Sequence, residues 1–577
     1  MCGIAVILPG SAISVPPFAI ERMTAALAHR GPDAQAVVRL PGCHLGHTRL
    51  SIIDLAGGAQ PMSDPSGRFH IVFNGEIYNY RDLRRELEAD GCTLRTHSDT
   101  EVLLQGYLRH GSRILPRLNG QFAFAIWDSA ERVLFTARDR FGEKPLYWAR
   151  SASGDVVIAS EIKAILASGL VATRIDPVSV DAYLGLFYVP PGRSIYANVH
   201  PVPPAHAMKW SGGEATTDCY WRPRFGGSGI SEPEAVEQIR SLLIRAVRRQ
   251  MVADVPVGAF LSGGLDSSTI VALMSRESSR PAQTYAVGFG DLINELPFAR
   301  EVAQACRSDH HELQMDIDVP SMLNRMADMY DEPFADSSNI PTYLVAEYAR
   351  RHVKVVLSGD GGDEIFGGYA WYTKLLGAPP DGDWWENHVA SGTGLLFDRS
   401  ALWGHGRQPP AAASVRDAYR PGADVAGMDR ASHFDVACYL AGDILVKVDR
   451  AAMAHGLETR APFLDAELAD FVLGLPWQMR FQGGRLKHLL REACEDLWPA
   501  SVRERGKQGF GAPVRHWLEN SQVGAMWDRV TRPDSPLLAL LPGVPKVAPE
   551  LRPQRKWSLL CLGLWLERRG ECLAKLP

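Results

Sequence analysis

The stretch FLSGGLDSS, residues 260–268, decides the fold of the second half of this chain. An apolar strand is predicted to end at its first serine, and a helix to begin near Asp266. The paired glycines let backbone N–H groups approach a ligand, and the amino end of a helix favours an anion. The Asp266 carboxylate is suited to Mg²⁺. The stretch predicts a phosphate-binding strand–turn–helix unit, although by itself it also fits a turn that only needs flexible residues.

Strand-like and helical segments alternate around this stretch. The runs VPVGAFLS (255–262), TYAVGF (284–289) and KVVLSGD (354–360) are separated by helical patterns. This alternation predicts a doubly wound parallel sheet of the α/β class. No GxxxxGK[ST] sequence occurs in the chain, which excludes a P-loop.

A second glycine-rich loop, LSGDGGDEIFGGY (357–369), also follows a predicted strand. Ligands of parallel sheets bind beyond the carboxyl ends of the strands, so we expect both loops to face one site. An acid from each loop, Asp266 and Asp363, would then share a metal ion bound to a triphosphate. A solvated acidic turn is the alternative for either loop alone.

The first half of the chain has a different pattern. Short strands such as CGIAVIL (2–8) and FAFAIWD (122–128) are separated by tight turns, with helices predicted over 79–90 and 99–109. This α+β pattern indicates a mixed sheet covered by helices. We therefore predict two domains, residues 2–212 and 232–577, joined by a linker over 213–231.

Three local features complete the prediction of structure. Ser231 and Glu234 form a capping box that starts a helix. The stretches 377–412 and 532–553 are expected to be loops or surface additions. His310 and His311 are adjacent but lack partner ligands, so we interpret them as structural residues.

Composition narrows the class of protein. A chain of 577 residues suggests roughly two to four domains, and a net charge of -5 gives no electrostatic case for nucleic acid or an anionic membrane. No apolar run approaches the roughly 18 residues that span a bilayer. Nine cysteines without a CxxC pair indicate a reducing compartment, so we expect a cytoplasmic protein without a structural zinc site.

The first half also carries residue types suited to amide hydrolysis. Cys2 is a candidate nucleophile whose own amine could act as its base once Met1 is removed. Asn74 and Gly75 are suited to donate to an oxyanion, and Arg49, Glu76 and Asp99 are suited to bind the charged groups of an amide substrate. Each has a plain alternative: a buried apolar cysteine, an Asn-Gly hairpin turn, a surface ion pair, or a helix cap at Asp99.

Motifs in both halves resemble one known family. The second half, with SGGLDSS, SGDGGDEIFGGY, VKVDRAAMAHGLETRAPFLD (446–465) and RGKQGFGAPVRHWL (505–518), is similar to the ATP-pyrophosphatase domain of glutamine-hydrolysing asparagine synthetases. The first half, with AHRGPD (28–33), HTRLSIIDL (47–55), NGEIYNY (74–80) and HSDTE (97–101), resembles class II glutamine amidotransferase domains. Those domains are N-terminal-nucleophile αββα sandwiches.

The resemblance implies roles for specific residues. ATP would be bound by Leu261, Ser262, Gly263, Gly264, Asp266, Ser267, Val287, Ser358 and Gly359, and Mg²⁺ by Asp266 and Asp363. Lys507 matches a lysine that stabilises the acyl-adenylate, and Asp360 is tied to forming that adenylate. Some family members carry glutamate at the position of Asp360, which puts the reach of the shorter side chain in doubt.

The expected activity is an ATP-dependent amidation that uses glutamine as the nitrogen donor. The default acceptor is aspartate, giving asparagine, AMP and pyrophosphate, and the resemblance implies that ammonia passes through an internal tunnel. Lys447, Arg450 and Arg460 are candidates to hold the acceptor carboxylate, although an internal salt bridge is the alternative for Arg460. Two alternatives stay open: the same chemistry on a sugar-acid or natural-product carboxylate, and a ligand-sensing homologue without catalysis. The sequence leaves the oligomeric state open, and a homodimer is compatible with the resemblance.

Overall fold

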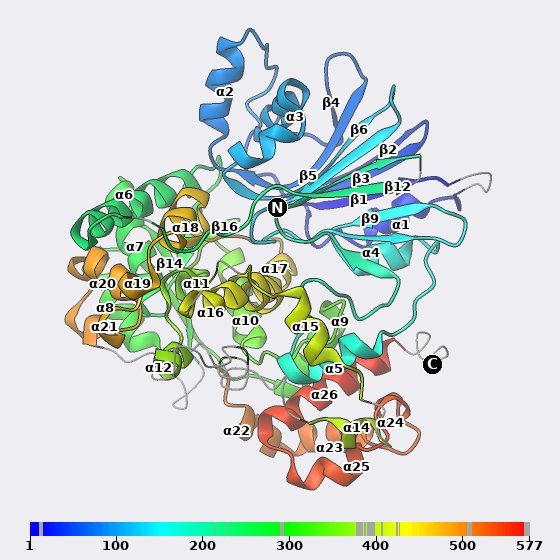
Figure 1. Ribbon diagram of the computed structural model, residues 1–577, viewed down its shortest axis with the longest axis vertical. Helices are drawn as coiled ribbons and strands as arrows, with labels where there is room; N and C mark the ends of the chain where they lie inside the picture. The colour runs from blue at the N-terminus through cyan, green and yellow to red at the C-terminus, as the bar shows by residue number, and fades with distance from the viewer. Residues whose placement is uncertain are drawn as a thin grey trace.

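The computed structural model describes residues 1–10, 15–212, 214–227, 229–288, 294–376, 385, 388, 398–404, 408–422, 425, 427–504 and 511–569. The amino-terminal half is a two-sheet sandwich, and the remainder packs against one side of it (Figure 1). The amino end of the chain lies between these two halves, where the Met1 ammonium contacts Glu458 at 2.9 Å.

Two six-stranded sheets form the sandwich. The first has the order β10 (Val199–Pro201), β8 (Tyr147–Arg150), β9 (Val156–Ala159), β1 (Gly3–Leu8), β3 (Cys43–Arg49) and β2 (Ala34–Leu40). The second has the order β12 (Glu214–Cys219), β11 (His206–Ser211), β7 (Val133–Arg138), β6 (Gly120–Asp128), β5 (Phe69–Ile77) and β4 (Met62–Ser63). The named strand pairs in both sheets are antiparallel.

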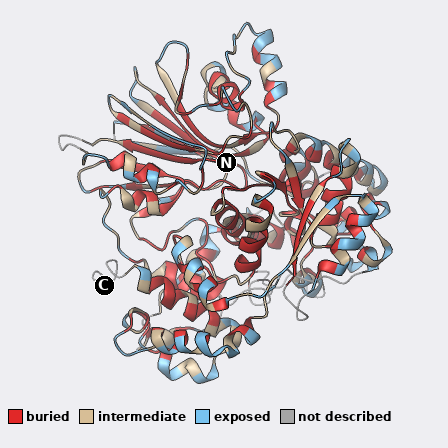
Figure 2. Cartoon of the chain, turned by 180° about the vertical axis from the view of Figure 1, so that it is seen from behind, coloured by how far each residue is buried: buried red, intermediate tan, exposed pale blue. Residues whose placement is uncertain are grey.

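Burial on both faces explains why the β1 sequence is apolar throughout. Successive side chains of a strand point to opposite faces of its sheet. Ile4 and Val6 accordingly pack in the core between the two sheets, whereas Ala5 and Ile7 pack against the covering helices. Figure 2 shows that the strands of the sandwich are buried along most of their length.

Helices cover the outer faces of the sandwich. α1 (Ala19–Ala25) and α4 (Ile162–Ala167) lie on the first sheet, and α2 (Tyr80–Ala89) and α3 (Asp99–His110) lie on the second, followed by the 3-10 helix η1 (Gly111–Arg117). Ser98 caps α3 by accepting a hydrogen bond from the Thr100 N–H. The αββα architecture and both predicted helices are therefore confirmed.

The segment expected to be a linker begins with a strand. β12 pairs along its whole length with β11 at the edge of the second sheet, so residues 214–219 continue the sandwich. The β-branched pair Thr216 and Thr217 favours this extended conformation. α6 (Glu232–Gln250) then starts at the predicted Ser231–Glu234 capping box.

The second half contains a five-stranded parallel sheet. Its order is β15 (Asp309–Gln314), β14 (Gln283–Gly288), β13 (Val257–Phe260), β16 (Val355–Leu357) and β17 (Glu458–Arg460). From β13 the chain moves outward to β14 and β15, and it later returns to the other side of β13 as β16. The predicted doubly wound fold is confirmed, and its switch point lies between β13 and β16, where such folds bind ligands.

Helices surround this sheet and extend into a carboxyl-terminal helical layer (Figure 1). The α-helices are α5 (Pro177–Leu186), α7 (Leu265–Glu277), α8 (Leu296–Cys306), α9 (Val319–Met329), α10 (Asn339–Arg350), α11 (Gly362–Phe366), α12 (Ala370–Leu376), α14 (Ser400–Trp403), α15 (Ala411–Ala418), α16 (Met428–Phe434), α17 (Leu445–Met453), α18 (Ala466–Leu473), α19 (Trp477–Arg480), α20 (His488–Cys494), α21 (Ala500–Glu504), α22 (Val514–Glu519), α23 (Ser521–Val530), α24 (Pro536–Leu540), α25 (Val544–Val547) and α26 (Pro553–Arg568). A π-helix, η2 (Asp435–Ile444), and short 3-10 turns η3 (Pro462–Leu464), η4 (Gln482–Gly484), η5 (Glu495–Leu497) and η6 (Ala548–Glu550) complete the described elements.

The expectation of loops over 532–553 is wrong. The segment forms α24, α25 and η6, and its Leu537, Leu541 and Val544 are buried in the core. Pro536, Pro545 and Pro549 stand in the first turns of these elements, where a missing N–H costs nothing, so they start helices rather than break them. Within 377–412, α14 and the start of α15 are helical, and most of 377–397 lies outside the described residues.

His310 and His311 both lie on β15. His310 Nδ1 is 2.9 Å from Thr284 Oγ1, and His311 stacks on Tyr285 and His352. No disulfide joins the cysteines of the described ranges. In those same ranges, no helix combines the length and apolar character required to cross a bilayer.

Candidate active sites

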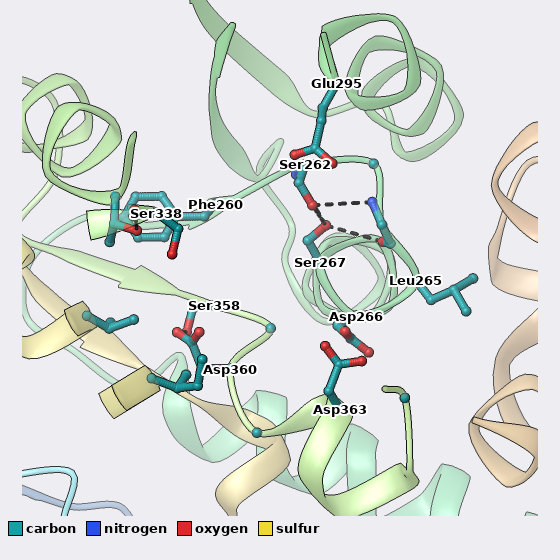
Figure 3. A pocket seen from close by; sticks show the side chains of 18 of the residues that line it. Phe260, Ser262, Leu265, Asp266, Ser267, Glu295, Ser338, Ser358, Asp360 and Asp363 are labelled. Carbon is teal, nitrogen blue, oxygen red and sulfur yellow. Dashed lines mark hydrogen bonds between the residues drawn. The ribbon is translucent and has the colours of Figure 1, made fainter. Parts of the chain in front are cut away.

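The loops after β13 and β16 open onto one cavity of about 590 Å³ (Figure 3). It is lined by all of the predicted nucleotide-binding residues: Leu261, Ser262, Gly263, Gly264, Asp266, Ser267, Val287, Ser358 and Gly359. Asp360 and Asp363 line it as well. Parallel pairing of β13 with β16 brings the carboxyl ends of both strands to the same edge of the sheet, which is why two loops almost a hundred residues apart meet.

The first loop is shaped for an anion. Gly263 has φ +68°, and a Cβ there would lie 2.5 Å from Phe298 Cβ, so only glycine fits. Gly264 is the residue before α7 and brings no side chain to cap the helix, and Leu265, Asp266 and Ser267 of the first turn line the cavity. Ser262 Oγ and Ser267 Oγ are 3.0 Å apart and hold the loop closed (Figure 3).

The two loops touch through glycines of the second loop. A Cβ at Gly359 or Gly362 would lie 2.7 Å from side-chain atoms of Asp266. This close approach lets the Asp266 and Asp363 carboxylates point toward each other (Figure 3). Lys487, just before α20, forms ion pairs with both of them.

The Asp266–Asp363 pair fits a divalent cation. One cation, the Lys487 ammonium, already bridges the two carboxylates. In proteins Mg²⁺ is commonly held by one or two carboxylates, with phosphate oxygens and waters completing its shell. Within the described ranges, no cluster of three or more His, Cys, Asp or Glu side chains offers a fuller metal site.

A second polar group lies across the cavity. Lys447 donates to Asp336 Oδ2 at 2.8 Å and to Ser338 Oγ at 2.9 Å. Asp360 Oδ2 accepts from Ser358 Oγ at 2.6 Å, and burial raises the pKa of the Asp360 carboxyl. Lys447 is therefore a buried cation close to the second loop.

Two of the three cations expected to hold an acceptor lie elsewhere. Arg450 is 2.8 Å from Glu161 and lies in a buried ion-pair network between the halves. Arg460 donates to Glu458 Oε1 at 2.7 Å, which matches the internal salt-bridge alternative. Arg450 thus pairs with an acid far away in the sequence, whereas Arg460 pairs with an acid of its own motif. Lys507 lies outside the described residues.

The second site surrounds Cys2, which is 7% exposed. The Cys2 N–H donates to Asn74 Oδ1 at 2.9 Å, and the Arg30 Nε donates to the Cys2 carbonyl at 3.0 Å. Burial raises the pKa of the Cys2 thiol, while the nearby amino terminus and the Leu50 N–H oppose that shift. Met1 precedes Cys2 in the structure, so the amine beside the thiol belongs to Met1.

Asn74 and Gly75, the expected oxyanion donors, are neighbours on β5, and Asn74 contacts Cys2. The Asn74 Nδ2 atom is buried and has no hydrogen-bond partner within the described residues, although its Oδ1 is held by Cys2. Gly75 has φ +154°, and a Cβ there would lie 2.0 Å from the Gln121 carbonyl oxygen. The close pairing of β5 with β6 therefore requires glycine at this position.

The expected glutamine-binding residues lie around the same strand. Asp99 Oδ2 accepts from the Ile77 N–H at 3.0 Å, and burial raises its pKa to about 6. Burial and the neighbouring Asp99 raise the pKa of Glu76 well above its usual value. Arg49 lies at the end of β3, and its Nη atoms donate to the carbonyls of Leu55 (3.0 Å) and Asp54 (2.8 Å).

A small cavity lies beside the larger one and is lined by residues of both halves of the chain. About 10 Å³ of it is open to the centre of a water-sized molecule, which is room for one water or ammonia molecule. Gln121 lines it from the sandwich, while Ser358, Asp360 and Val448 line both this cavity and the nucleotide cavity. Gln121 pairs in register with Glu76, and both of its buried side-chain amide atoms lack partners within the described part of the chain.

Sequence reasoning missed three groups of the two sites. Lys487 lies outside the motifs quoted from the sequence, three residues after Gly484, and only the need to balance the acids of the cavity could have indicated it. Gln121 lies in an apolar strand run, where a buried amide is itself an unusual residue. Glu458 lies within a quoted motif but reaches the amino terminus only through the fold.

Comparison with known proteins agrees with this geometry. Residues 238–563 match the asparagine synthase family, and residues 1–221 match the glutamine amidotransferase domain family. The chain is 34% identical to asparagine synthetase [glutamine-hydrolyzing] 1 of Bacillus subtilis, covering 87% of this chain and 85% of that protein. It is 35% identical to a putative asparagine synthetase [glutamine-hydrolyzing] of Mycobacterium tuberculosis (95% and 93%) and 30% identical to asparagine synthetase B [glutamine-hydrolyzing] of Escherichia coli (85% and 79%). The chain therefore belongs to the asparagine synthase family of glutamine-dependent amidotransferases.

Proposed function

We propose that this enzyme converts aspartate to asparagine, taking nitrogen from glutamine and releasing AMP and pyrophosphate from ATP. The observation that carries the proposal is the convergence of the helix N-terminus at Gly264 with Asp266 and Asp363 in one cavity. That arrangement suits the binding of a triphosphate and the release of pyrophosphate. The names of the curated relatives support asparagine as the product.

The glutaminase step starts at Cys2 after Met1 has been removed. The thiol attacks the side-chain carbonyl carbon of glutamine, and the free α-amine of Cys2 takes the thiol proton. Asn74 Nδ2 and the Gly75 N–H stabilise the oxyanion, and the proton passes to the leaving nitrogen as ammonia departs. Water then hydrolyses the thioester and releases glutamate. Arg49 binds the α-carboxylate of glutamine, and Glu76 and Asp99 bind its α-ammonium.

In the synthetase step, an oxygen of the acceptor carboxylate attacks the α-phosphorus of ATP, and pyrophosphate leaves. The first-turn N–H groups of α7 and the hydroxyls of Ser262 and Ser267 bind the leaving pyrophosphate. Asp266 and Asp363 would hold Mg²⁺, which supplies positive charge to the phosphate oxygens when bound. Ammonia then attacks the acyl carbon of the adenylate, AMP departs, and Lys507 stabilises the developing negative charge.

Ammonia travels between the sites through the cavity beside Gln121. The cavity has the right size for ammonia and shares lining residues with the nucleotide cavity. Passage inside the protein keeps ammonia from being protonated or lost in bulk water. This route would explain why one chain carries both half-reactions.

An acceptor assay tests the proposal. The purified enzyme is given MgATP, glutamine and one carboxylic acid at a time, and nucleotide products and pyrophosphate are measured. We expect AMP and pyrophosphate in equal amounts with aspartate, together with asparagine. AMP formation with a sugar acid or another carboxylate but not with aspartate would contradict the acceptor and leave the reaction class intact. ADP as the product with every acceptor, or no nucleotide turnover at all, would contradict the reaction class.

A further inference from the structure

The synthetase half reaches into the glutamine site through β17. Arg460 is 1% exposed, and its Nη2 atom lies 3.7 Å from Oε1 of Glu76, across the boundary between the halves. The acid is in the sandwich and the arginine is in the parallel sheet. A residue proposed to bind glutamine therefore has its ion-pair partner in the other catalytic domain.

Neighbouring groups hold the Arg460 guanidinium in a single orientation. Its Nη1 donates to the carbonyls of Gln250 and Val252, both at 2.7 Å, and its Nε donates to Glu458 Oε1 at 2.7 Å. Three donors of the planar fork are thus committed to fixed partners. Nη2 is left directed toward Glu76, and within the described residues it has no hydrogen-bond partner.

Glu76 needs a cation at this position. It is buried, and the Asp99 and Glu458 carboxylates lie close enough to disfavour its ionised form. Arg460 and the amino terminus are the positive groups that act in the opposite direction. The second carboxylate oxygen of Glu76, Oε2, has no partner within the described part of the chain, so one oxygen faces Arg460 and the other remains for a ligand.

We propose that Arg460 is a positioning residue of the glutamine site, supplied by the synthetase domain, that orients the Glu76 carboxylate to receive the α-ammonium of glutamine. The inference rests on the proposed glutamine-binding role of Glu76. It also links the two sites, because the Arg460 carbonyl accepts a hydrogen bond of 2.8 Å from the N–H of Ser358 in the nucleotide loop. Glutamine binding thus depends on the docking of the two domains.

Glutamine affinity and glutaminase kinetics of full-length variants test this role. We expect Arg460→Met to raise the KM for glutamine roughly tenfold or more, because it leaves a buried acid without its partner, with a smaller effect on kcat. Arg460→Lys should restore part of the affinity. The defect should lessen as pH rises, because higher pH ionises Glu76 without help from a cation. In a Cys2→Ala background, calorimetry should show that Arg460→Met raises the Kd for glutamine by the same factor.

A buried arginine of the same domain provides the matched control. Arg480 is also 1% exposed and pairs with Asp429, away from both sites. Arg480→Met should lower thermal stability but leave the KM for glutamine unchanged. Equal KM increases in both methionine variants would show a general loss of structure and overturn the proposal. If Arg460→Met does not fold, the KM of Arg460→Lys for glutamine is measured as a function of pH instead. A pH profile identical to that of the wild type would overturn the proposal.

Glu76→Gln separates this inference from the proposed function. If Glu76→Gln leaves the KM for glutamine unchanged, the glutamine-binding role of Glu76 is wrong. If Glu76→Gln raises that KM but Arg460→Met does not, the role of Glu76 stands and the inference about Arg460 is wrong. We expect both single variants to be impaired and the double variant to be little worse than Glu76→Gln, because the two residues act through one contact.

Discussion

The backbone N–H of Cys2 donates a hydrogen bond of 2.9 Å to Oδ1 of Asn74. This contact joins the proposed nucleophile, which directly precedes β1 of one sheet, to the proposed oxyanion donor on β5 of the other sheet. Because Oδ1 is the acceptor, the amide nitrogen of Asn74 is presented as a donor. The sandwich fold thus sets the orientation of the amide before a substrate binds.

Loss of the Cys2 thiol should separate the two half-reactions. Cys2→Ala should abolish glutamine-dependent amide synthesis, because losing a covalent nucleophile costs on the order of 10⁴–10⁶ in rate. Synthesis from added ammonium should persist, since the synthetase site needs only free ammonia. Amide product and glutamate are measured with each nitrogen source. A variant in which an added residue blocks Met1 removal keeps the thiol but loses the amine base, and continued glutamine consumption by it would refute the N-terminal mechanism.

The metal-binding role of Asp266 can be tested without changing its shape. Asp266→Asn should reduce amide synthesis by at least about 100-fold, because the metal site loses a charged ligand, while glutamine hydrolysis continues. The Mg²⁺ concentration for half-maximal ATP binding should rise in parallel. Asp309→Asn, at an exposed position on β15, is the control and should behave as wild type. Normal ATP-dependent synthesis by Asp266→Asn would remove this residue from the site.

Blocking the cavity beside Gln121 should uncouple glutamine hydrolysis from amide synthesis. Gln121→Trp should fill the passage, so glutamine is still hydrolysed but less amide is formed per glutamate released. Overpacking of a buried site typically costs 1–3 kcal/mol, so thermal unfolding is measured as well. Gln121→Leu, which is similar in size, should keep the ratio closer to wild type. A wild-type ratio in a folded Gln121→Trp enzyme would exclude this route.

Glutamine hydrolysis should lose efficiency in mild acid. Burial raises the pKa of Asp99 to about 6, and only the ionised carboxylate can pair with the α-ammonium of glutamine. The kcat/KM for glutamine should therefore fall as pH drops through about 6, by roughly tenfold per pH unit below it. Ammonium-dependent synthesis, corrected for the free ammonia present at each pH, should lack this limb. The persistence of the same limb in Asp99→Asn would assign it to another group.

Local sequence determined much of this protein. Glycines, serines and acids spaced within one loop are enough to predict a phosphate-binding turn, because the turn depends on interactions among residues that are close in the sequence. Gly263 is predictable in this sense, because its positive φ is a property of one residue and its turn. The same holds for the Ser98 cap of α3 and the Ser231–Glu234 capping box of α6, which are completed within four residues.

Contacts between distant segments were decided only by the tertiary structure. Lys487 meets Asp266 from 221 residues away, and Arg460 meets Glu76 from the other domain. Arg450 and Arg460 share a motif with Lys447, yet only Lys447 reaches the nucleotide cavity. A motif specifies which charges are available, but burial requires each charge to find a partner, and the packing of the two domains selects that partner. The sequence therefore determined the chemistry of each site, whereas the docked fold decided which residues complete it.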